Sequence, residues 1–190
     1  MQGIYPAART VGGYYGPLSP TYRRVMDWDV EPTAFSEYVT IGARDGELPV
    51  EVATTTNDGF ADADPRSPAT DLGARGLFTD VGPADHGALF DVALPELDPG
   101  ESYSFSMFYG AAASSAAAER ALGLVEADAW SLAEPNVVDG AQLGQPNTFV
   151  FALRFDRPML AARLMTEGSH APATTAPAPP IARHDGVARQ

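Results

Sequence analysis

Hydrophobic and polar residues alternate along most of the chain between Tyr22 and Phe155. A period of two is typical of a β-strand with one buried face, whereas the side chains of a helix repeat about every 3.6 residues. In the stretch YRRVMDWDV, which ends at Val30, one face is mainly aromatic and aliphatic and the other is mainly charged. Arg24 and Val25 are the exceptions. This pattern predicts a strand in a sheet with one packed face and one polar face.

The same alternation returns later in the chain and predicts further strands. The predicted strands, each with the residues expected to face inward, are EYVTI (Val39, Ile41), LPVEVATT (Leu48, Val50, Val52), HGALFDVALPEL (Ala88, Phe90, Val92, Leu94), SYSFSMFYG (Tyr103, Phe105, Met107, Tyr109) and NTFVFALRF (Phe149, Phe151, Leu153, Phe155). RGLFTDVG is a shorter candidate strand.

The segment LDPGES lies between two of these strands and predicts a turn. Pro99 fixes its own φ, and Gly100 supplies the positive φ that a type II turn requires. Because a short turn between two alternating segments is typical of a hairpin, we expect the strands on either side of it to pair with each other.

The segment SSAAAERALGLVEADAW breaks the alternation and predicts a helix. Its apolar residues recur at helical spacing: Ala118, Leu122, Val125 and Ala129. Ser114 or Ser115 is a suitable N-cap, and we predict an amphipathic helix over 115–128 on the outside of a sheet or across one open end. Short strands, turns and one helix together predict an antiparallel β-sandwich.

Composition divides the chain into three parts. Residues 1–21 are rich in Gly, Pro and Tyr without a period, and we expect an irregular lead-in. Residues 22–156 carry the strand pattern and form the predicted sandwich domain. Residues 157–190 become rich in Pro, Ala and Thr, a composition that cannot bury enough apolar surface to fold, so we expect a disordered tail.

Charge and residue usage exclude several classes of function. The 190 residues carry a net charge of -13, which argues against nucleic acid because phosphate binding needs a basic patch. Cysteine is absent, so disulfides, thiolate nucleophiles and cysteine-bound metals are excluded. No segment reaches the roughly 18 apolar residues of a membrane span, and the first residues lack the basic and apolar regions of a signal peptide.

Asp27 and Asp29 are the candidate catalytic pair. At positions i and i+2 of a strand they share a face about 6.6 Å apart, within the range of paired glycosidase carboxylates. Arg23 on the same face would set their charge state. The alternative is that these charges form cross-strand ion pairs on a solvated face.

The loop NDGFADADP is a candidate calcium site. It offers four oxygen-bearing side chains: Asn57, Asp58, Asp62 and Asp64. Calcium prefers such oxygen ligands, but the spacing is not that of an EF-hand, and a solvated turn around the Asp-Gly pair is the alternative.

Trp28, Arg23 and His86 are the candidate ligand-binding residues. His86 follows Asp85, yet neighbours on a strand point to opposite faces, so a loop entering the strand is the alternative to a binding role. Trp28 would offer a flat ring for stacking a sugar, or would belong to the core, where large aromatic residues are common. No Ser-His-Asp set or histidine cluster can be assembled, because the other histidines lie in the tail.

Three blocks of sequence carry a resemblance to a known family. YRRVMDWDVEPTAFSEYVTI, GPADHGALFDVALPELDPGESYSFSMFYGAA and GQPNTFVFALRF occur here in that order. Together they resemble an uncharacterised domain of secreted and cell-surface bacterial proteins, which occurs in actinobacterial exported proteins and in proteins with PEP-CTERM sorting tails. The resemblance implies an extracellular or cell-surface location and a β-rich fold, and it assigns no catalytic residue.

The resemblance favours a non-enzymatic β-sandwich module, in adhesion, glycan or protein binding, or structural spacing. The alternatives are a carbohydrate-active enzyme or its remnant, and a truncated gene product without independent function. In similar proteins further strands precede the first block, whereas here only residues 1–21 do. A sandwich without those strands exposes a sheet edge, so we expect marginal stability or self-association through that edge.

Overall fold

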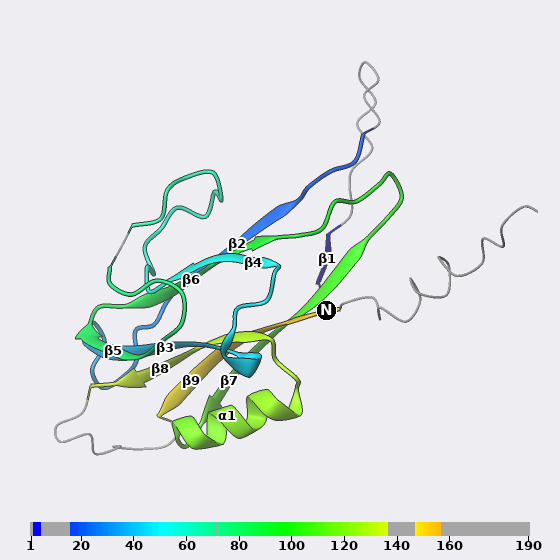
Figure 1. Cartoon of the computed structure of the whole chain (residues 1–190). Coiled ribbons are helices and arrows are strands. Elements are labelled where there is room, and N and C mark those ends of the chain that lie inside the picture. Colours follow the sequence, from blue (N-terminus) through cyan, green and yellow to red (C-terminus); the bar gives the residue numbers. More distant parts are fainter. Residues whose placement is uncertain (1, 5–15, 71, 137–146, 157–190) are drawn as a thin grey trace, which may run out of the picture. The chain divides into compact units, whose positions relative to one another are not determined.

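Two antiparallel β-sheets and one α-helix form the part of the chain that the computed structural model describes (Figure 1). That part comprises residues 2–4, 16–70, 72–136 and 147–156. The chain divides into two units, 1–156 and 157–190, and all of the described residues belong to the first. The predicted disordered tail lies outside the described residues.

The two sheets differ in size, and every strand pair in them is antiparallel. In spatial order, the larger sheet contains β1 (Gln2–Ile4), β7 (Tyr103–Ala112), β9 (Thr148–Phe155), β8 (Ala129–Pro135), β3 (Glu37–Ala43) and β5 (Phe78–Ala84). The smaller sheet contains β2 (Thr21–Asp27), β6 (Gly87–Ala93) and β4 (Val52–Thr56). A short 3₁₀ turn, η1 (Arg44–Gly46), follows β3. The predicted antiparallel β-sandwich with one helix is confirmed.

The space between the sheets is filled by apolar and aromatic side chains from both of them. Phe90 of the smaller sheet and Phe105 and Phe151 of the larger one are fully buried. The rings of Phe90 and Phe151 lie 5.4 Å apart, centroid to centroid, and are tilted. Burying one such side chain contributes about 1.5–3 kcal/mol. The alternation in HGALFDVALPEL therefore predicted the inward face of β6 correctly, including Ala88 and Val92.

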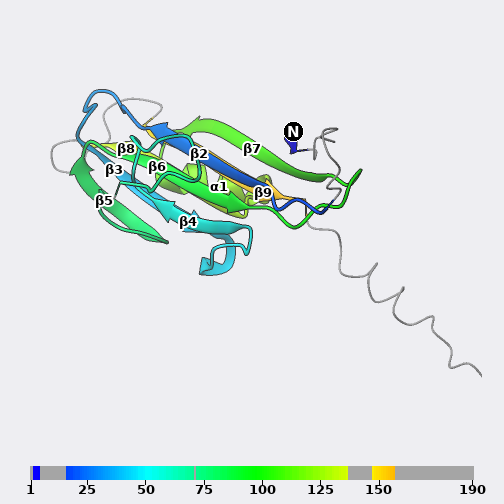
Figure 2. The ribbon, with the colours of Figure 1, turned by 90° about the horizontal axis from the view of Figure 1, so that it is seen from above.

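The helix α1 (Ser115–Leu124) covers the outer face of the larger sheet, opposite the smaller sheet (Figures 1 and 2). Ala118 and Leu122 are buried against Val150 and neighbouring residues of β8 and β9. The Oγ atom of Ser114 accepts a hydrogen bond from the Ala117 amide and caps the helix. The predicted position outside a sheet is confirmed.

The predicted helix end at 128 is wrong. The helix ends at Leu124, and Glu126 turns the chain with a φ of 54°. From Ala129 the chain runs as β8, which the hydrophobic pattern did not reveal. The reason is that α1 covers one face of this strand and the sandwich core the other, so alternation is lost.

The predicted hairpin at LDPGES is also wrong. The turn itself forms, with Gly100 at a φ of 91°. However, β6 pairs with β2 and β4, whereas β7 pairs with β1 and β9. The turn thus carries the chain from one sheet to the other. The apolar faces of the two strands meet across the sandwich, and alternation alone does not distinguish this packing from pairing side by side.

Two predicted strand limits need correction. Val50 is 89% exposed rather than inward, because a turn closed by the Val52 amide and the Pro49 carbonyl precedes β4. The first strand ends at Asp27 rather than Val30.

The outermost strands of the sheets include a part of the predicted irregular lead-in. Gln2–Ile4 form β1, which pairs with Tyr103–Phe105 of β7. The sheets end at β1 and β5 in one case and at β2 and β4 in the other. Self-association through such an edge stays a prediction.

Candidate functional site

Three carboxylates meet at one end of the sandwich. Asp27 ends β2 in the smaller sheet, and Glu37 begins β3 in the larger one. Asp85 lies in the connection from β5 to β6, which crosses between the sheets at the same end. One oxygen from each residue lies within 4.8 Å of the others, and this is the one such group of His, Asp and Glu in the described ranges. The topology therefore builds an acidic cluster from three separate parts of the chain.

Glu37 is the buried member of this cluster, with 0% of its surface exposed. Its Oε1 atom accepts a hydrogen bond of 3.0 Å from the backbone amide of His86. Its buried Oε2 atom has no hydrogen-bond partner. Burial raises the pKa of Glu37; the His86 amide opposes this shift, and the charges of Asp85 and Asp27 add to it.

Asp27 is the exposed member and lies beside other negative charges. Partial desolvation raises its pKa, and the charges of Asp29 and Asp85 raise it further. Within the described residues, the arginine ion pairs involve Asp91, Asp128 and Asp64, and none reaches the cluster. The three carboxylates therefore carry a negative charge that no neighbouring arginine neutralises.

His86 and Asn57 form a second buried polar pair next to the cluster. His86 is 2% exposed, and its Nδ1 atom lies 3.1 Å from Nδ2 of Asn57. The other ring nitrogen of His86, Nε2, is buried without a partner. Burial lowers the pKa of His86, against the opposing charge of Asp85, and so favours the neutral ring.

Two glycines bring the 57–59 segment onto the same end. A Cβ atom on Gly87 would lie 2.1 Å from the Cα atom of Gly59, which no side chain allows. A Cβ atom on Gly59 would also lie 3.2 Å from the Cα atom of Asp27. This close approach brings Asp58 to the polar end, where Oδ1 accepts the Phe60 amide and the buried Oδ2 has no partner. We call Asp27, Glu37, Asn57, Asp58, Asp85 and His86 the polar end.

Arg23, which the sequence placed beside Asp27 and Asp29, is instead paired elsewhere. Its guanidinium group binds Asp91, its cross-strand partner, with contacts of 2.6 and 2.9 Å. It also donates to the carbonyl groups of Asp62, Asp64 and Ser67. Arg23 therefore holds the 62–67 loop against the smaller sheet, and the expectation that it sets the charge of Asp27 and Asp29 is wrong.

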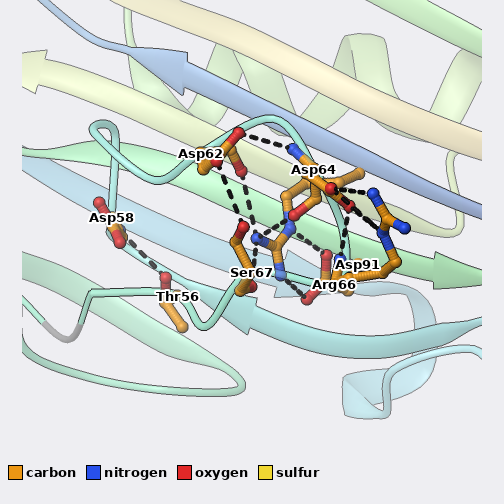
Figure 3. A network of polar contacts seen from close by, with 8 residues as sticks. Thr56, Asp58, Asp62, Asp64, Arg66, Ser67 and Asp91 are labelled. Atoms are coloured by element: carbon orange, nitrogen blue, oxygen red, sulfur yellow. Dashed lines mark hydrogen bonds and ion pairs between the residues drawn. The ribbon is translucent and has the colours of Figure 1, made fainter.

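The four predicted calcium ligands do not converge. Asp62 accepts hydrogen bonds from the Asp64 amide and the Ser67 hydroxyl group, within its own loop. The carboxylate of Asp64 pairs with Arg66 at 2.6 Å, which lowers the pKa of Asp64 to about 2 (Figure 3). Asn57 and Asp58 belong to the polar end. Over the described residues, the aspartates of this set do not gather their oxygens at metal-binding distance.

Two residues of the cluster were not among the predicted site residues: Glu37, and Asp85, which was considered only as the neighbour of His86. A signal for Glu37 was present, because it has the same parity as the buried Val39 and Ile41 in EYVTI. A carboxylate on the buried face of a strand is rare unless it has a partner. Asp85 offered no such signal, because its position depends on how β5 and β6 connect the sheets.

Trp28 lies at the border of the polar end and the core. It is half-buried against core residues, and its Nε1 atom donates a hydrogen bond of 3.0 Å to the Ser131 hydroxyl group. Its backbone amide donates to the carbonyl group of His86. Trp28 thereby connects β2 to the 85–86 connection and to β8.

The fold and the cluster define the class of the protein: an antiparallel β-sandwich with an acidic, partly buried end. Comparisons with protein-family models, curated proteins and solved structures found no match to this chain. No helix in the described ranges is long and apolar enough to cross a membrane.

Proposed function

We propose that this chain is a non-enzymatic β-sandwich module of a bacterial exported or cell-surface protein, and that it binds a calcium ion through Asp27, Glu37 and Asp85. Its work is adhesion, the binding of a glycan or partner protein, or spacing. The location rests on the three sequence blocks that resemble exported bacterial domains. The calcium site rests on one observation, the convergence of three carboxylates, one of which, Glu37, has a buried oxygen without a partner.

The distances suit a calcium ion. Calcium lies about 2.3–2.6 Å from its oxygen ligands, so two ligands on opposite sides of the ion are roughly 5 Å apart. The three carboxylate oxygens lie within 4.8 Å of one another. An all-carboxylate set favours a hard cation such as calcium over zinc or copper. Water would complete the six to eight ligands that calcium takes.

The free-energy cost of these carboxylates also favours a bound cation. A buried carboxylate without a counter-charge costs several kcal/mol of stability, and like charges beside it add to the cost. A bound divalent cation would offset both the cost of burying the Glu37 carboxylate and the repulsion from the neighbouring carboxylates. Because Asp27 and Glu37 belong to different sheets, one ion would also clamp the sheets together. Calcium would thus stabilise the module in an extracellular setting.

The enzymatic alternative has less support. It requires Asp27 and Asp29 to line a cleft that admits a glycan. Instead, an oxygen of Asp27 lies within 4.8 Å of oxygens of Glu37 and Asp85. The cross-strand pairing of Arg23 with Asp91 is what a structural polar face contains.

Calorimetry and thermal melting of chelator-treated protein test the calcium site. We expect saturable heat on adding calcium, and a stability gain of about 2.7 kcal/mol at a hundredfold excess over Kd. Glu37→Gln keeps the shape and removes the charge, and should abolish most of this gain. Asp62→Asn is the matched control in the 62–67 loop and should leave it unchanged.

Two results would contradict this proposal. One is the absence of both heat and a melting shift with millimolar calcium. The other is loss of binding in Asp62→Asn with binding retained in Glu37→Gln, which would move the site to the loop.

A further inference from the structure

A second polar region lies at the other side of the larger sheet, beside α1. An open pocket of about 490 Å³ lies there between α1, the end of β3 and the start of β8. Its lining combines an aromatic ring with three carboxylates: Trp130, Asp45, Glu119 and Glu126. None of these residues belongs to the polar end, so a ligand in this pocket would bind independently of the calcium site.

The indole ring of Trp130 forms one wall of this pocket. Trp130 faces Gly42 in the register of β8 and β3. A Cβ atom on Gly42 would lie 2.3–2.7 Å from three atoms of the indole ring, so the ring lies across the Gly42 Cα atom. One ring face therefore rests on the backbone of β3. Trp130 also packs against the apolar residues under α1 but is only partly buried, and the exposed part of its ring lines the pocket.

The charges of the pocket are unbalanced. Asp45, Glu119 and Glu126 are exposed side chains. One cation, Arg44, also lines the pocket, and its guanidinium group is directed to Asp128 at 3.8 Å and to the carbonyl groups of Ala127 and Glu126. Its charge is therefore shared with Asp128 and backbone oxygens, and the three carboxylates outnumber this one cation beside the exposed part of the Trp130 ring.

We propose that this pocket binds the guanidinium group of an arginine side chain from a partner protein. A planar guanidinium stacks on an indole face, and its forked N–H groups match carboxylates. Carboxylates only accept hydrogen bonds, so the ligand must supply the donors. The net charge of -13 on the whole chain adds long-range attraction for a basic partner.

Tryptophan fluorescence gives a direct test. The chain has two tryptophans, so Trp28→Phe leaves Trp130 as the sole reporter. The probe is a capped Gly-Arg-Gly peptide, and the matched probe replaces arginine with citrulline, its uncharged analogue. We expect a saturable change with the arginine peptide, and at least tenfold weaker binding of the citrulline peptide.

Matched variants test whether the arginine peptide binds in this pocket. The double variant Glu119→Gln/Glu126→Gln should lower the affinity for the arginine peptide at least tenfold. Higher salt should lower this affinity too. Glu31→Gln/Glu96→Gln removes the same charge from exposed positions outside the pocket lining and should change affinity less than twofold. Melting curves establish that each variant is folded. Calorimetry on Trp130→Phe, which keeps a smaller ring, should show weakened binding without relying on fluorescence.

Several outcomes would overturn the proposal. They are no saturable response to the arginine peptide, equal binding of the citrulline peptide or of neutral sugars, and equal losses in both double variants. Free arginine binding as tightly as the peptide would contradict the assignment to a partner protein.

Discussion

The aromatic middle of the sandwich and its polar end are buried to a similar degree but are built from opposite residues. In the middle, Phe90, Phe105 and Phe151 are fully buried and contact one another or neighbouring rings. At the polar end, Glu37 and Asn57 are just as buried but present charge and hydrogen-bonding groups. Four side chains of this end each leave one buried polar atom without a partner: Glu37, Asn57, Asp58 and His86. Such groups are few in native proteins and each calls for a reason.

Arg24 is a charged residue that points into the aromatic middle, and its surroundings differ from those of the carboxylates at the polar end. It points inward from β2, and its buried Nε atom has no hydrogen-bond partner. The guanidinium carbon lies 5.4 Å from the centroid of the Tyr109 ring and 6.0 Å from that of Phe151. Ring faces therefore stabilise this charge. The carboxylates of the polar end have no comparable partner. The difference teaches that the middle supplies stability, whereas the polar end costs stability and is better explained by a ligand.

The largest predicted effect is in the middle. Phe151→Ala removes a fully buried ring that packs on Phe90 and Tyr109. The free energy of unfolding should fall by about 3–5 kcal/mol, measured by urea denaturation. Tyr109→Ala, at a position that is 58% exposed, is the control and should cost much less. A loss below about 1 kcal/mol for Phe151→Ala would show that the middle is not the source of stability.

The next effect should have the opposite sign and occurs at the polar end. In chelator at pH 8, Glu37→Gln should raise the free energy of unfolding by about 1–3 kcal/mol, the cost of a buried acceptor without a partner. The Gln amide keeps an acceptor for the His86 N–H and offers donors to Asp27 and Asp85. Glu96→Gln, at an exposed position, should change stability little.

The stability gained by Glu37→Gln should change with pH, because it depends on the pKa of Glu37. Burial raises the pKa of Glu37 in the folded protein above its ordinary value of 4.5. At a pH between this ordinary value and the raised pKa, the folded state therefore binds more protons than the unfolded state. Stability therefore falls as pH rises through the window, and Glu37→Gln removes this slope. His86 acts oppositely, because its lowered pKa costs stability as pH falls below 6.5. If the variant were less stable than wild type at both pH 5 and pH 8, the charge of Glu37 would not be a liability.

The same contrast explains what the sequence can predict. The inward faces of β6 and β9 are predictable from alternation, because each has a continuous apolar row that includes Phe90 or Phe151. The strand β8 is not, because it is covered on both sides. The polar end is harder still, since Asp27, Glu37 and Asp85 meet only once two sheets are stacked. Carboxylates that are close in sequence, such as Asp62 and Asp64, instead bind their own loop.

The smallest effect is expected at α1, which belongs to neither region. Ser114→Ala removes the hydrogen bond from the Ala117 amide to Oγ and should cost about 1 kcal/mol, whereas Ser114→Gly should cost only a few tenths. Because α1 covers the outer face of the sheet, this loss should be independent of calcium and of Glu37. In Ser114→Ala/Glu37→Gln the two changes should add to within about 0.5 kcal/mol, as expected for sites without shared partners. Urea denaturation of both single variants and the double variant measures this. A coupling above about 1 kcal/mol would mean that the helix and the polar end are not separate parts of the fold.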